Sequence, residues 1–475
     1  MKRTDLFIDG EWKKASKYKP IHSPYNGEKI AEVGQAQEED ISAAIDAASR
    51  AFPLFSKTPA HRRADILNNF ASIMRKRRTE LAEIVANEAA KPIKTAFGEV
   101  DRTVQTYLVA AEEAKRIEGH TLPLDAAPGG EGRFTYTVRK PIGIIGAITP
   151  FNFPFNLVAH KVGPALAAGN CVILKPASQT PLSSLVLGEI AAEASLPGGV
   201  LNILPGDGGT VGERIVTDPR IAAVTFTGSP EVGIAMKNKA GLKRVTLELG
   251  SNSAVIIDRD TDLEGNVVTR CVWGAFVNNG QVCISLQRIY VHNSLYQKFL
   301  DKFIEEARKL KIGSPLDQAT DITALISTRE VDRVDKWVSE AISMGATARL
   351  GGQRLSERIY PPTVLTEVPP SANISCQEAF APVVTITPFS CIKEAFEHVN
   401  NSKFGLQAGI YTKDINTAMA ASEDLQVGGV MINDIPTFRV DHMPYGGVKQ
   451  SGCGREGVRY AIEEMTEIKL ISIKL

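Results

Sequence analysis

Cys283 is the residue whose type and setting point most directly to chemistry. It lies in a polar, glycine-containing segment, residues 278–285, directly before the apolar run 288–291. A cysteine in a loop beside a strand can be exposed and activated as a thiolate nucleophile, whereas Cys171 lies inside an apolar run, where a thiol usually fills the core. The sequence therefore makes Cys283 a candidate nucleophile, and a purely structural cysteine is the alternative.

Two further polar residues stand where buried strands are expected to end. Glu248 lies within the apolar run 245–250, and burying a carboxylate there without a partner would cost several kcal/mol. We therefore expect Glu248 to be paired, hydrogen-bonded or functional, with a satisfied acid in an edge strand as the alternative. Asn152 lies between Pro150 and Pro154, which exclude helix and strand, so we expect it on a rigid loop at the carboxyl end of a parallel strand, where such sheets bind ligands.

Glycine-rich turns suggest a dinucleotide site without matching its usual fingerprint. Residues 206–212 place their last glycine one position too late for G-x-G-x-x-G, and no Lys-Ser or Lys-Thr pair follows Gly233, which excludes a P-loop. Segment 228–233 still offers free backbone N–H groups at the start of a helix, an anion site suited to a pyrophosphate. The alternative is a turn between strand and helix that needs glycine only for tight packing.

Parallel β-sheets are needed to position these residues, and the hydrophobic pattern predicts two such sheets. Short apolar runs alternate with segments of helical periodicity, which is typical of right-handed βαβ units in doubly wound sheets. The first series of runs covers residues 142–148, 171–174, 200–204 and 222–226, and the second covers 254–257, 289–291, 383–386, 408–411 and 430–433. We therefore expect an α/β protein with a Rossmann-like dinucleotide-binding domain at residues 1–121 and 141–248, and an α/β catalytic domain at residues 249–448.

Two segments remain outside these domains. Residues 122–140 are typical of a projecting hairpin, and the tail, residues 462–475, alternates apolar and polar residues like a strand that needs an edge to pair with. We expect these segments to form a small β oligomerisation element, so that the protein is a homodimer or a homotetramer.

Composition excludes several classes of partner. The 475 residues include 54 Lys plus Arg and 54 Asp plus Glu, so a nucleic acid or an anionic membrane finds no net charge of opposite sign. The longest apolar stretch, residues 142–148, is far shorter than the roughly 20 residues of a membrane span, and the N-terminus lacks the apolar core of a secretory signal. Six cysteines without a C-x-x-C pair fit a reducing compartment and no metal site. We therefore expect a cytoplasmic protein.

Taken together, the motifs resemble those of the aldehyde dehydrogenase superfamily, and the resemblance runs essentially from end to end. Each motif alone is weak, but seven of them in the right order are specific. The matching segments are residues 150–154, 175–178, 226–233, 247–250, 280–283, 377–382 and 444–452.

The resemblance implies a role for each candidate residue. It makes Cys283 the nucleophile, Glu248 the general base that activates water, and Asn152 a donor to the oxyanion together with the Cys283 backbone N–H. An aldehyde would be oxidised with NAD(P) to the carboxylic acid through a thiohemiacetal and a thioester on Cys283. The residues that it implies for cofactor binding are Thr149, Pro150, Lys175, Ser178, Gly208, Phe226, Gly228, Ser229, Gly233, Leu249, Gly250, Glu378 and Phe380.

Ser178 departs from the pattern of NAD-preferring relatives. These commonly carry glutamate at this position, where the carboxylate holds the adenosine ribose and repels a 2′-phosphate. Because that repulsion is missing here and Lys175 is nearby, we expect NADP to be accepted, either alongside NAD or in preference to it. The alternative is that Ser178 merely caps the following helix.

The expected substrate tunnel departs from the family pattern as well. Relatives that oxidise apolar aldehydes line it with Trp, Met and Phe, whereas Arg102, His160 and Arg439 fall at or near these positions. Such potential cations favour a small polar or anionic aldehyde of the lactaldehyde, semialdehyde or phosphonoacetaldehyde type. The alternative is that the arginines are exposed or pair along helices. The other residues implied for substrate binding are Phe153, Asn156, Val282, Ile284 and Tyr445.

The same scaffold is compatible with two other functions. A CoA-acylating semialdehyde dehydrogenase or a γ-phosphate reductase needs no water-activating acid, so the presence of Glu248 argues against both. A catalytically silent binding or structural member would be expected to have lost its nucleophile, yet Cys283, Glu248 and Asn152 are all present.

Overall fold

The first sheet has five parallel strands at its centre and an antiparallel edge on each side. The computed structural model describes residues 2–475. The strand order is β21-β11-β10-β7-β8-β9-β2-β3. The strands are β2 (Leu6–Ile8), β3 (Glu11–Lys13), β7 (Ile144–Ile148), β8 (Cys171–Lys175), β9 (Leu201–Ile203), β10 (Ile221–Thr227), β11 (Arg244–Glu248) and β21 (Gly452–Cys453). The parallel strands β7 and β8 are buried along their whole length, because helices cover both faces.

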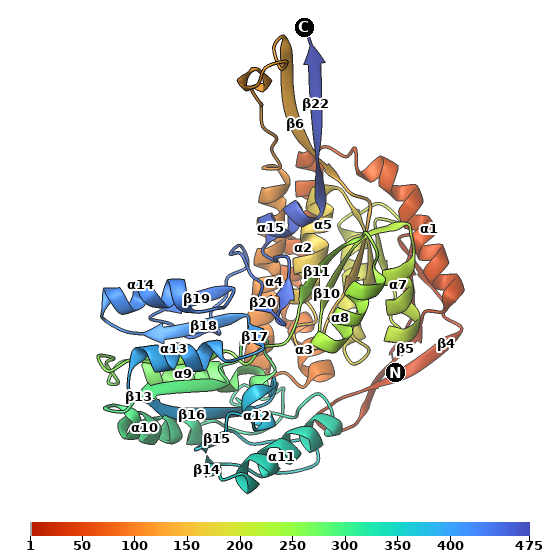
Figure 1. Ribbon diagram of the computed structural model, residues 1–475. Coiled ribbons are helices and arrows are strands. Elements are labelled where there is room, and N and C mark those ends of the chain that lie inside the picture. The colour runs from red at the N-terminus through yellow and green to blue at the C-terminus, as the bar shows by residue number, and fades with distance from the viewer. Residues whose placement is uncertain (1) are drawn as a thin grey trace.

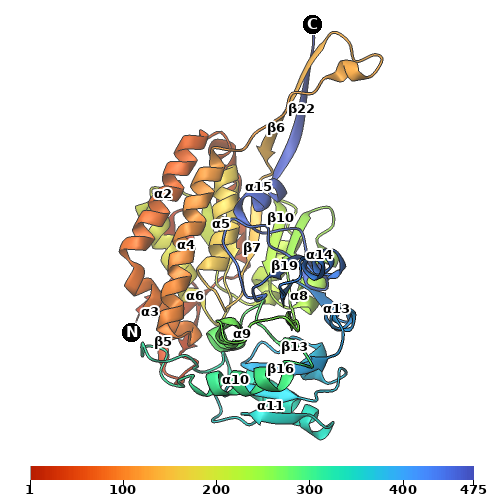
Figure 2. The same ribbon diagram turned by 90° about the vertical axis from the view of Figure 1, so that its left-hand side faces the viewer.

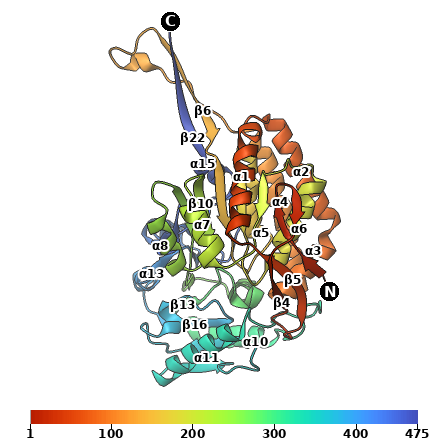
Figure 3. The ribbon, with the colours of Figure 1, turned by 90° about the vertical axis from the view of Figure 1, so that its right-hand side faces the viewer.

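The side of the sheet to which successive strands are added reverses between β7 and β10. Doubly wound sheets bind their ligands at such a point. From β7 the chain winds outward to β8 and β9 on one side, then crosses back to β10 and β11 on the other. Helices α5 and α6 cover one face, with α2, α3 and α4 packed over them, and α1, α7 and α8 lie on the opposite face (Figures 2 and 3). The helices are α1 (Glu38–Phe55), α2 (Ala60–Lys76), α3 (Arg78–Ala89), α4 (Ile93–Ala114), α5 (Asn156–Ala168), α6 (Pro181–Glu193), α7 (Glu213–Thr217), α8 (Pro230–Lys239) and α15 (Val458–Glu464).

The second sheet has seven strands in the order β14-β15-β16-β13-β12-β18-β19, of which only β14 is antiparallel. It lies below the first sheet in Figure 1. Its strands are β12 (Ala254–Ile257), β13 (Arg288–His292), β14 (Thr347–Leu350), β15 (Thr363–Thr366), β16 (Val383–Phe389), β18 (Gln407–Tyr411) and β19 (Gly429–Ile432). Its helices are α9 (Val267–Phe276), α10 (Tyr296–Arg308), α11 (Thr328–Ser343), α12 (Asn373–Cys376), α13 (Ile392–Asn400) and α14 (Ile415–Asp424). The predicted architecture of two α/β sheets is confirmed.

A long two-stranded ribbon projects from the body (Figure 1). Strand β6 (Arg133–Pro141) pairs antiparallel with the tail strand β22 (Thr466–Lys474) along nine residues. The hairpin expected within 122–140 is present only in a short form, in which residues 120–122 pair with 135–137. The tail strand, for which an edge partner was expected, provides the long partner of β6. The ribbon leaves Phe134, Ile468 and Leu470 exposed. Its role in oligomerisation stays a prediction.

Short elements complete the fold. Strands β1 (Lys2–Thr4), β4 (Lys17–His22) and β5 (Lys29–Gln35) form a small sheet, and β17 (Phe404–Gly405) pairs with β20 (Val448–Lys449). Single helical turns occupy Leu124–Ala126, Gly208–Gly212 and Val277–Gly280. Within residues 2–475, no helix combines the length and apolarity that crossing a bilayer requires.

Candidate active site

A cavity of about 630 Å³ lies between α4, α9, the start of α5 and two loops, residues 277–284 and 437–445. It brings together nine of the residues expected at the site, from segments spread over most of the chain. They are Arg102, Asn152, Phe153, Asn156, Val282, Cys283, Ile284, Arg439 and Tyr445. Sequence reasoning missed further lining residues, among them Lys94, Leu157, Arg270, Trp273 and Phe438.

The loop that carries Cys283 has an unusual backbone. After α9 ends at Phe276, three consecutive residues take left-handed conformations, with φ values of 51° at Asn278, 58° at Asn279 and 69° at Gly280. Asparagine and glycine tolerate this region better than other residues, which explains the Asn-Asn-Gly sequence. Gly280 has a second reason, because a Cβ there would lie 2.1 Å from the carbonyl oxygen of Ala381.

Side chains of this loop fasten it to the strap formed by residues 323–326. The Asn279 carboxamide accepts a hydrogen bond from the Thr323 N–H at 2.7 Å and donates one to the Ala324 carbonyl at 3.1 Å. Gln281 Oε1 accepts from the Ile326 N–H at 3.1 Å. These contacts are buried, so they hold the backbone in its left-handed course and fix the direction in which Cys283 points.

Asn152 lies against the same loop. It follows β7, as expected, and its Nδ2 donates a hydrogen bond to the carbonyl of Gln281 at 3.0 Å, whereas its buried Oδ1 has no partner among the described residues. Burial, followed by the negative charges of Glu378 and Glu248, raises the pKa of the Cys283 thiol to about 12. The cysteine is therefore a neutral thiol in this state, with an amide donor beside its loop.

Glu248 ends β11 and is 3% exposed. Neither of its carboxyl oxygens has a hydrogen-bond partner among residues 2–475. Burial, followed by the negative charge of Glu456, raises the pKa of Glu248 well above its ordinary value. It does not line the cavity but lies against Gly446, where a Cβ would come within 2.8 Å of Oε1. The sequence predicted that Glu248 is paired, hydrogen-bonded or functional; because neither oxygen has a hydrogen-bond partner among residues 2–475, its functional role stays a prediction.

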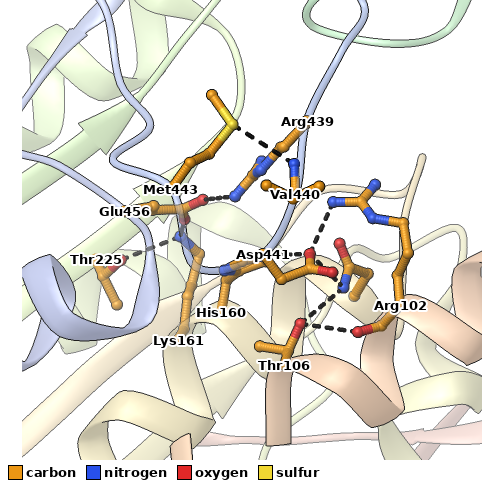
Figure 4. A network of polar contacts seen from close by, with 11 residues as sticks. Arg102, Thr106, His160, Lys161, Thr225, Arg439, Val440, Asp441, Met443 and Glu456 are labelled. Atoms are coloured by element: carbon orange, nitrogen blue, oxygen red, sulfur yellow. Dashed lines mark hydrogen bonds and ion pairs between the residues drawn. The ribbon is translucent and has the colours of Figure 1, made fainter. Parts of the chain in front are cut away.

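A buried ion network stands next to Glu248 (Figure 4). Lys161 Nζ lies 2.8 Å from Glu456 Oε1 and 3.0 Å from Thr225 Oγ1, and Arg439 Nη2 lies 3.1 Å from Glu456 Oε2. The Arg439 guanidinium also stacks 3.6 Å over the ring of Tyr445. Although burial alone would raise it, the charges of Lys161 and Arg439 hold the pKa of Glu456 well below its usual range. Lys161 carries the same signal in the sequence as Glu248, a charge inside an apolar run.

A second network surrounds Asp441 (Figure 4). Its Oδ1 accepts from Arg102 Nη2 at 2.8 Å and contacts His160 Nε2 at 2.9 Å. Burial, followed by the charge of Arg439, lowers the pKa of His160, so that its ring is neutral and donates from Nε2. Of the three potential cations expected in the tunnel, Arg102 and Arg439 line the cavity, and His160 lies behind it.

The residues expected to hold a cofactor meet at the carboxyl ends of the parallel strands of the first sheet. Lys175 ends β8 and Ser178 follows it, Thr149 and Pro150 follow β7, and Leu249 and Gly250 follow β11. Phe226 lies in β10, Gly228 and Ser229 precede α8, Gly233 lies in the first turn of α8, and Gly208 begins the helical turn after β9. Glu378 and Phe380 reach this edge from the second sheet, because the Glu378 carboxylate accepts from the Ser251 N–H at 2.9 Å and the Phe380 ring lies 5.7 Å from that of Phe151.

Two glycines of this group serve packing. A Cβ at Gly233 would lie 2.5 Å from Leu249, and one at Gly228 would lie 2.4 Å from the ring of Phe226. Ser229 caps α8, since its Oγ accepts from the Val232 N–H. The start of α8 therefore combines tight packing with the N–H groups of a helix terminus, which suit a pyrophosphate.

The charged residues of this edge also fit a dinucleotide. Burial lowers the pKa of Lys175 to about 8, and its Nζ makes one hydrogen bond, to the Pro176 carbonyl at 3.3 Å, which leaves donors for ribose or phosphate oxygens. Ser178 Oγ donates to the Gly206 carbonyl and brings no negative charge. Burial raises the pKa of Glu378 to about 7. Among the described residues no cluster of three or more His, Cys, Asp or Glu side chains could hold a metal ion.

Comparison with known proteins agrees over the whole chain. Residues 12–471 match the model of the aldehyde dehydrogenase family. A 3-sulfolactaldehyde dehydrogenase of Priestia aryabhattai is 45% identical over 475 residues, 100% of this chain and 99% of that protein. A lactaldehyde dehydrogenase of Methanococcus aeolicus is 40% identical over 472 residues, 98% of this chain and 99% of that protein.

Solved structures show the same similarity. Aldehyde dehydrogenase 21 from Physcomitrella patens, in complex with the reaction product succinate, superposes with a TM-score of 0.97 at 41% identity over 100% of this chain and 98% of that one. A glyceraldehyde-3-phosphate dehydrogenase from Methanocaldococcus jannaschii, complexed with NADP, gives a TM-score of 0.92 at 39% identity over 97% of this chain and 100% of that one.

Proposed function

Because this chain belongs to the aldehyde dehydrogenase family, we propose that it oxidises a small anionic or strongly polar aldehyde to the carboxylic acid with NADP or NAD. The observation that carries this proposal is the cavity that the Cys283 thiol shares with three arginines, Arg102, Arg270 and Arg439. A nucleophile and several cations in one cavity suit a substrate with an aldehyde at one end and an anion at the other.

In the first half of the reaction, Cys283 Sγ adds to the aldehyde carbonyl after losing its proton. The Asn152 amide, now bonded to the Gln281 carbonyl, would turn to the developing oxyanion and meet it together with the Cys283 N–H. The bound nicotinamide dinucleotide would supply the hydride acceptor. What remains on Cys283 is a thioester.

In the second half, Glu248 would remove a proton from the water that hydrolyses this thioester. The carboxyl group must first lose its own proton, which its raised pKa opposes and the nearby charges of Arg439 and Lys161 favour. A Glu248→Gln enzyme should therefore keep a rapid burst of reduced cofactor, equal to one per active site, while steady turnover falls by at least 100-fold. Equal slowing of burst and steady state would contradict the assignment of Glu248 to hydrolysis.

The substrate class is tested with a panel of four aldehydes: succinate semialdehyde, lactaldehyde, phosphonoacetaldehyde and hexanal. The names of two relatives support the polar aldehydes of this panel as substrates, since one is a 3-sulfolactaldehyde dehydrogenase and the other a lactaldehyde dehydrogenase. We expect the highest kcat/KM for one of the first three. A clear advantage for hexanal would refute the proposal.

We propose that NADP is accepted because Ser178 lacks the carboxylate that would repel a 2′-phosphate and Lys175 keeps free donors beside it. Ser178→Glu should lower kcat/KM for NADP by at least tenfold and leave that for NAD within threefold. A wild-type preference for NAD above about tenfold, which corresponds to about 1.4 kcal/mol, would count against the assignment.

We further propose that the ribbon β6–β22 joins subunits into a homodimer or homotetramer, since it projects from the body with Phe134, Ile468 and Leu470 exposed. Light scattering coupled to gel filtration tests this. A protein truncated after residue 465 should then contain fewer subunits per particle than the full chain.

A further inference from the structure

Asp441 gathers three donors on one carboxylate oxygen (Figure 4). Arg102 Nη2 lies 2.8 Å, His160 Nε2 2.9 Å and Asn156 Nδ2 3.4 Å from Oδ1. These donors come from α4 and α5, whereas Asp441 belongs to the loop 437–445. The loop that carries Arg439 is therefore tied to both helices through one side chain.

Asp441 is not itself a wall of the cavity. It is buried, and it does not line the cavity that Arg102 lines. Although burial would raise it, His160 and Arg102 hold the pKa of Asp441 well below its usual range, so the group is a carboxylate at every physiological pH. Arg102 thus stands between a fixed negative charge and the cavity.

This arrangement fixes the guanidinium of Arg102. The group carries five N–H donors in a rigid fork, and Asp441 engages one of them, while the side chain remains about one-third exposed toward the cavity. The Arg102 carbonyl also accepts from Thr106 Oγ1, which in turn accepts from Asn156 Nδ2 at 3.1 Å. An arginine without these contacts would lose much of its rotamer freedom when it bound an anion.

We infer that Asp441 is a positioning residue for substrate selection: by holding Arg102 from behind, it directs the free N–H groups of that arginine at the anionic end of the aldehyde. The inference rests on the proposed function, because it concerns the substrate class of the same site. A rival role is charge neutralisation, in which Asp441 weakens the attraction of Arg102 for anions. The two roles predict opposite effects of removing the carboxylate.

The test uses the full-length enzyme and two aldehydes of equal chain length, succinate semialdehyde and butanal. We expect Asp441→Asn to raise KM for succinate semialdehyde at least tenfold, with kcat within threefold and with KM for butanal unchanged. Asp101→Asn is the matched control, since this neighbour of Arg102 on α4 pairs with Arg78 in an exposed ion pair. It should leave both aldehydes unaffected.

A double-mutant cycle then asks whether Asp441 acts through Arg102. Arg102→Ala should lower kcat/KM for succinate semialdehyde about 30-fold or more, and the variant with both changes should match Arg102→Ala within twofold. Losses that multiply would overturn the inference, as would an Asp441→Asn enzyme that binds the anion better. Asp441→Glu keeps the charge and should recover at least threefold of the KM loss, which also provides a second variant if Asp441→Asn folds poorly.

A binding measurement without turnover completes the test. Succinate should slow iodoacetamide labelling of Cys283 in the wild type more strongly than butyrate does, and Asp441→Asn should lose this difference. If wild type does not prefer succinate semialdehyde to butanal, the proposed function fails and takes this inference with it. If wild type has that preference and Asp441→Asn retains it in full, only the positioning role is refuted.

Discussion

Gly280→Ala tests whether the left-handed loop is what places the Cys283 thiol. Gly280 combines a φ of 69° with a close approach to the neighbouring chain, since an added Cβ would lie 2.1 Å from the oxygen and 2.5 Å from the carbon of the Ala381 carbonyl. Both of these atoms are backbone. Neither can rotate away, so the loop or the segment before β16 must move.

The size of the effect follows from two contributions. An alanine in the left-handed region costs about 1–2 kcal/mol relative to glycine. Ordinary contacts of a Cβ begin near 3.0 Å, so the approach of 2.1 Å forces a shift of about 1 Å, and overpacking of this kind adds about 1–3 kcal/mol. A displacement of about 1 Å at a reacting group can cost on the order of 100-fold in rate. We therefore expect the free energy of unfolding to fall by about 2–5 kcal/mol and the rate to fall on the order of 100-fold.

Gly129→Ala provides the matched control, because Gly129 also has a positive φ, 88°, but a Cβ there would meet nothing within 4 Å. Because the entropy of unfolding is roughly 1 kcal/mol/K for a chain of 475 residues, the thermal midpoint should fall by about 2–5 °C for Gly280→Ala. The control should lose about 1–2 °C, since it carries only the cost of a left-handed alanine. Assays at 25 °C should give kcat/KM lowered about 100-fold for Gly280→Ala alone. A Gly280→Ala enzyme with wild-type turnover and the midpoint of the control would refute the reasoning.

Two further predictions concern the groups around the thiol. Asn152→Ala should lower kcat about 10²–10³-fold, because it removes an oxyanion donor; near-normal kcat would contradict that role. The thermal midpoint should change little, because Asn152 Oδ1 has no partner and the Gln281 carbonyl that accepts from Asn152 Nδ2 also accepts from Asn278 Nδ2 at 3.2 Å. Because the pKa of Glu248 is raised and the base acts only after losing its proton, kcat in wild type should rise as pH increases through that raised pKa, as measured from steady-state rates. The rise should be absent from Glu248→Gln, and a kcat that falls with pH would contradict it.

The scaffold was predictable because its signals are local. Buried parallel strands read as short apolar runs, and each expected run between residues 142 and 257 is a strand of one of the two sheets. The same local logic placed Asn152 after β7 and Glu248 at the end of β11, since a proline pair and a carboxylate in an apolar run are visible in sequence. The ribbon was less predictable, because the partner of β6 comes from the other end of the chain.

The ion pairs behind the cavity wall could not be predicted from such local signals. Asp441 and Arg102 are 339 residues apart, and Glu456 and Lys161 are 295 residues apart. Nothing in the composition of either segment indicates which acid meets which cation, because exposed pairs and buried pairs use the same residue types. For His160, the expectation of charge and position drawn from the sequence was wrong. Its sequence position suggested a cation in the tunnel, whereas burial keeps its ring neutral behind the cavity wall.

The pairing of each cavity arginine with an acid explains how this site could be selective for anions while the chain as a whole has no net charge. Arg102, Arg270 and Arg439 have carboxylate partners that do not line the cavity, namely Asp441, Asp434 and Glu456. The remaining wall includes apolar groups such as Trp273. An apolar aldehyde would displace the water bonded to the guanidinium groups and offer no acceptor in its place. The charged N–H donors would then lack hydrogen-bond partners. The preference for anionic over uncharged aldehydes would then arise mainly because the site rejects the uncharged ones. Removing the acid that pairs with a cavity arginine should therefore lower this preference more than added salt does.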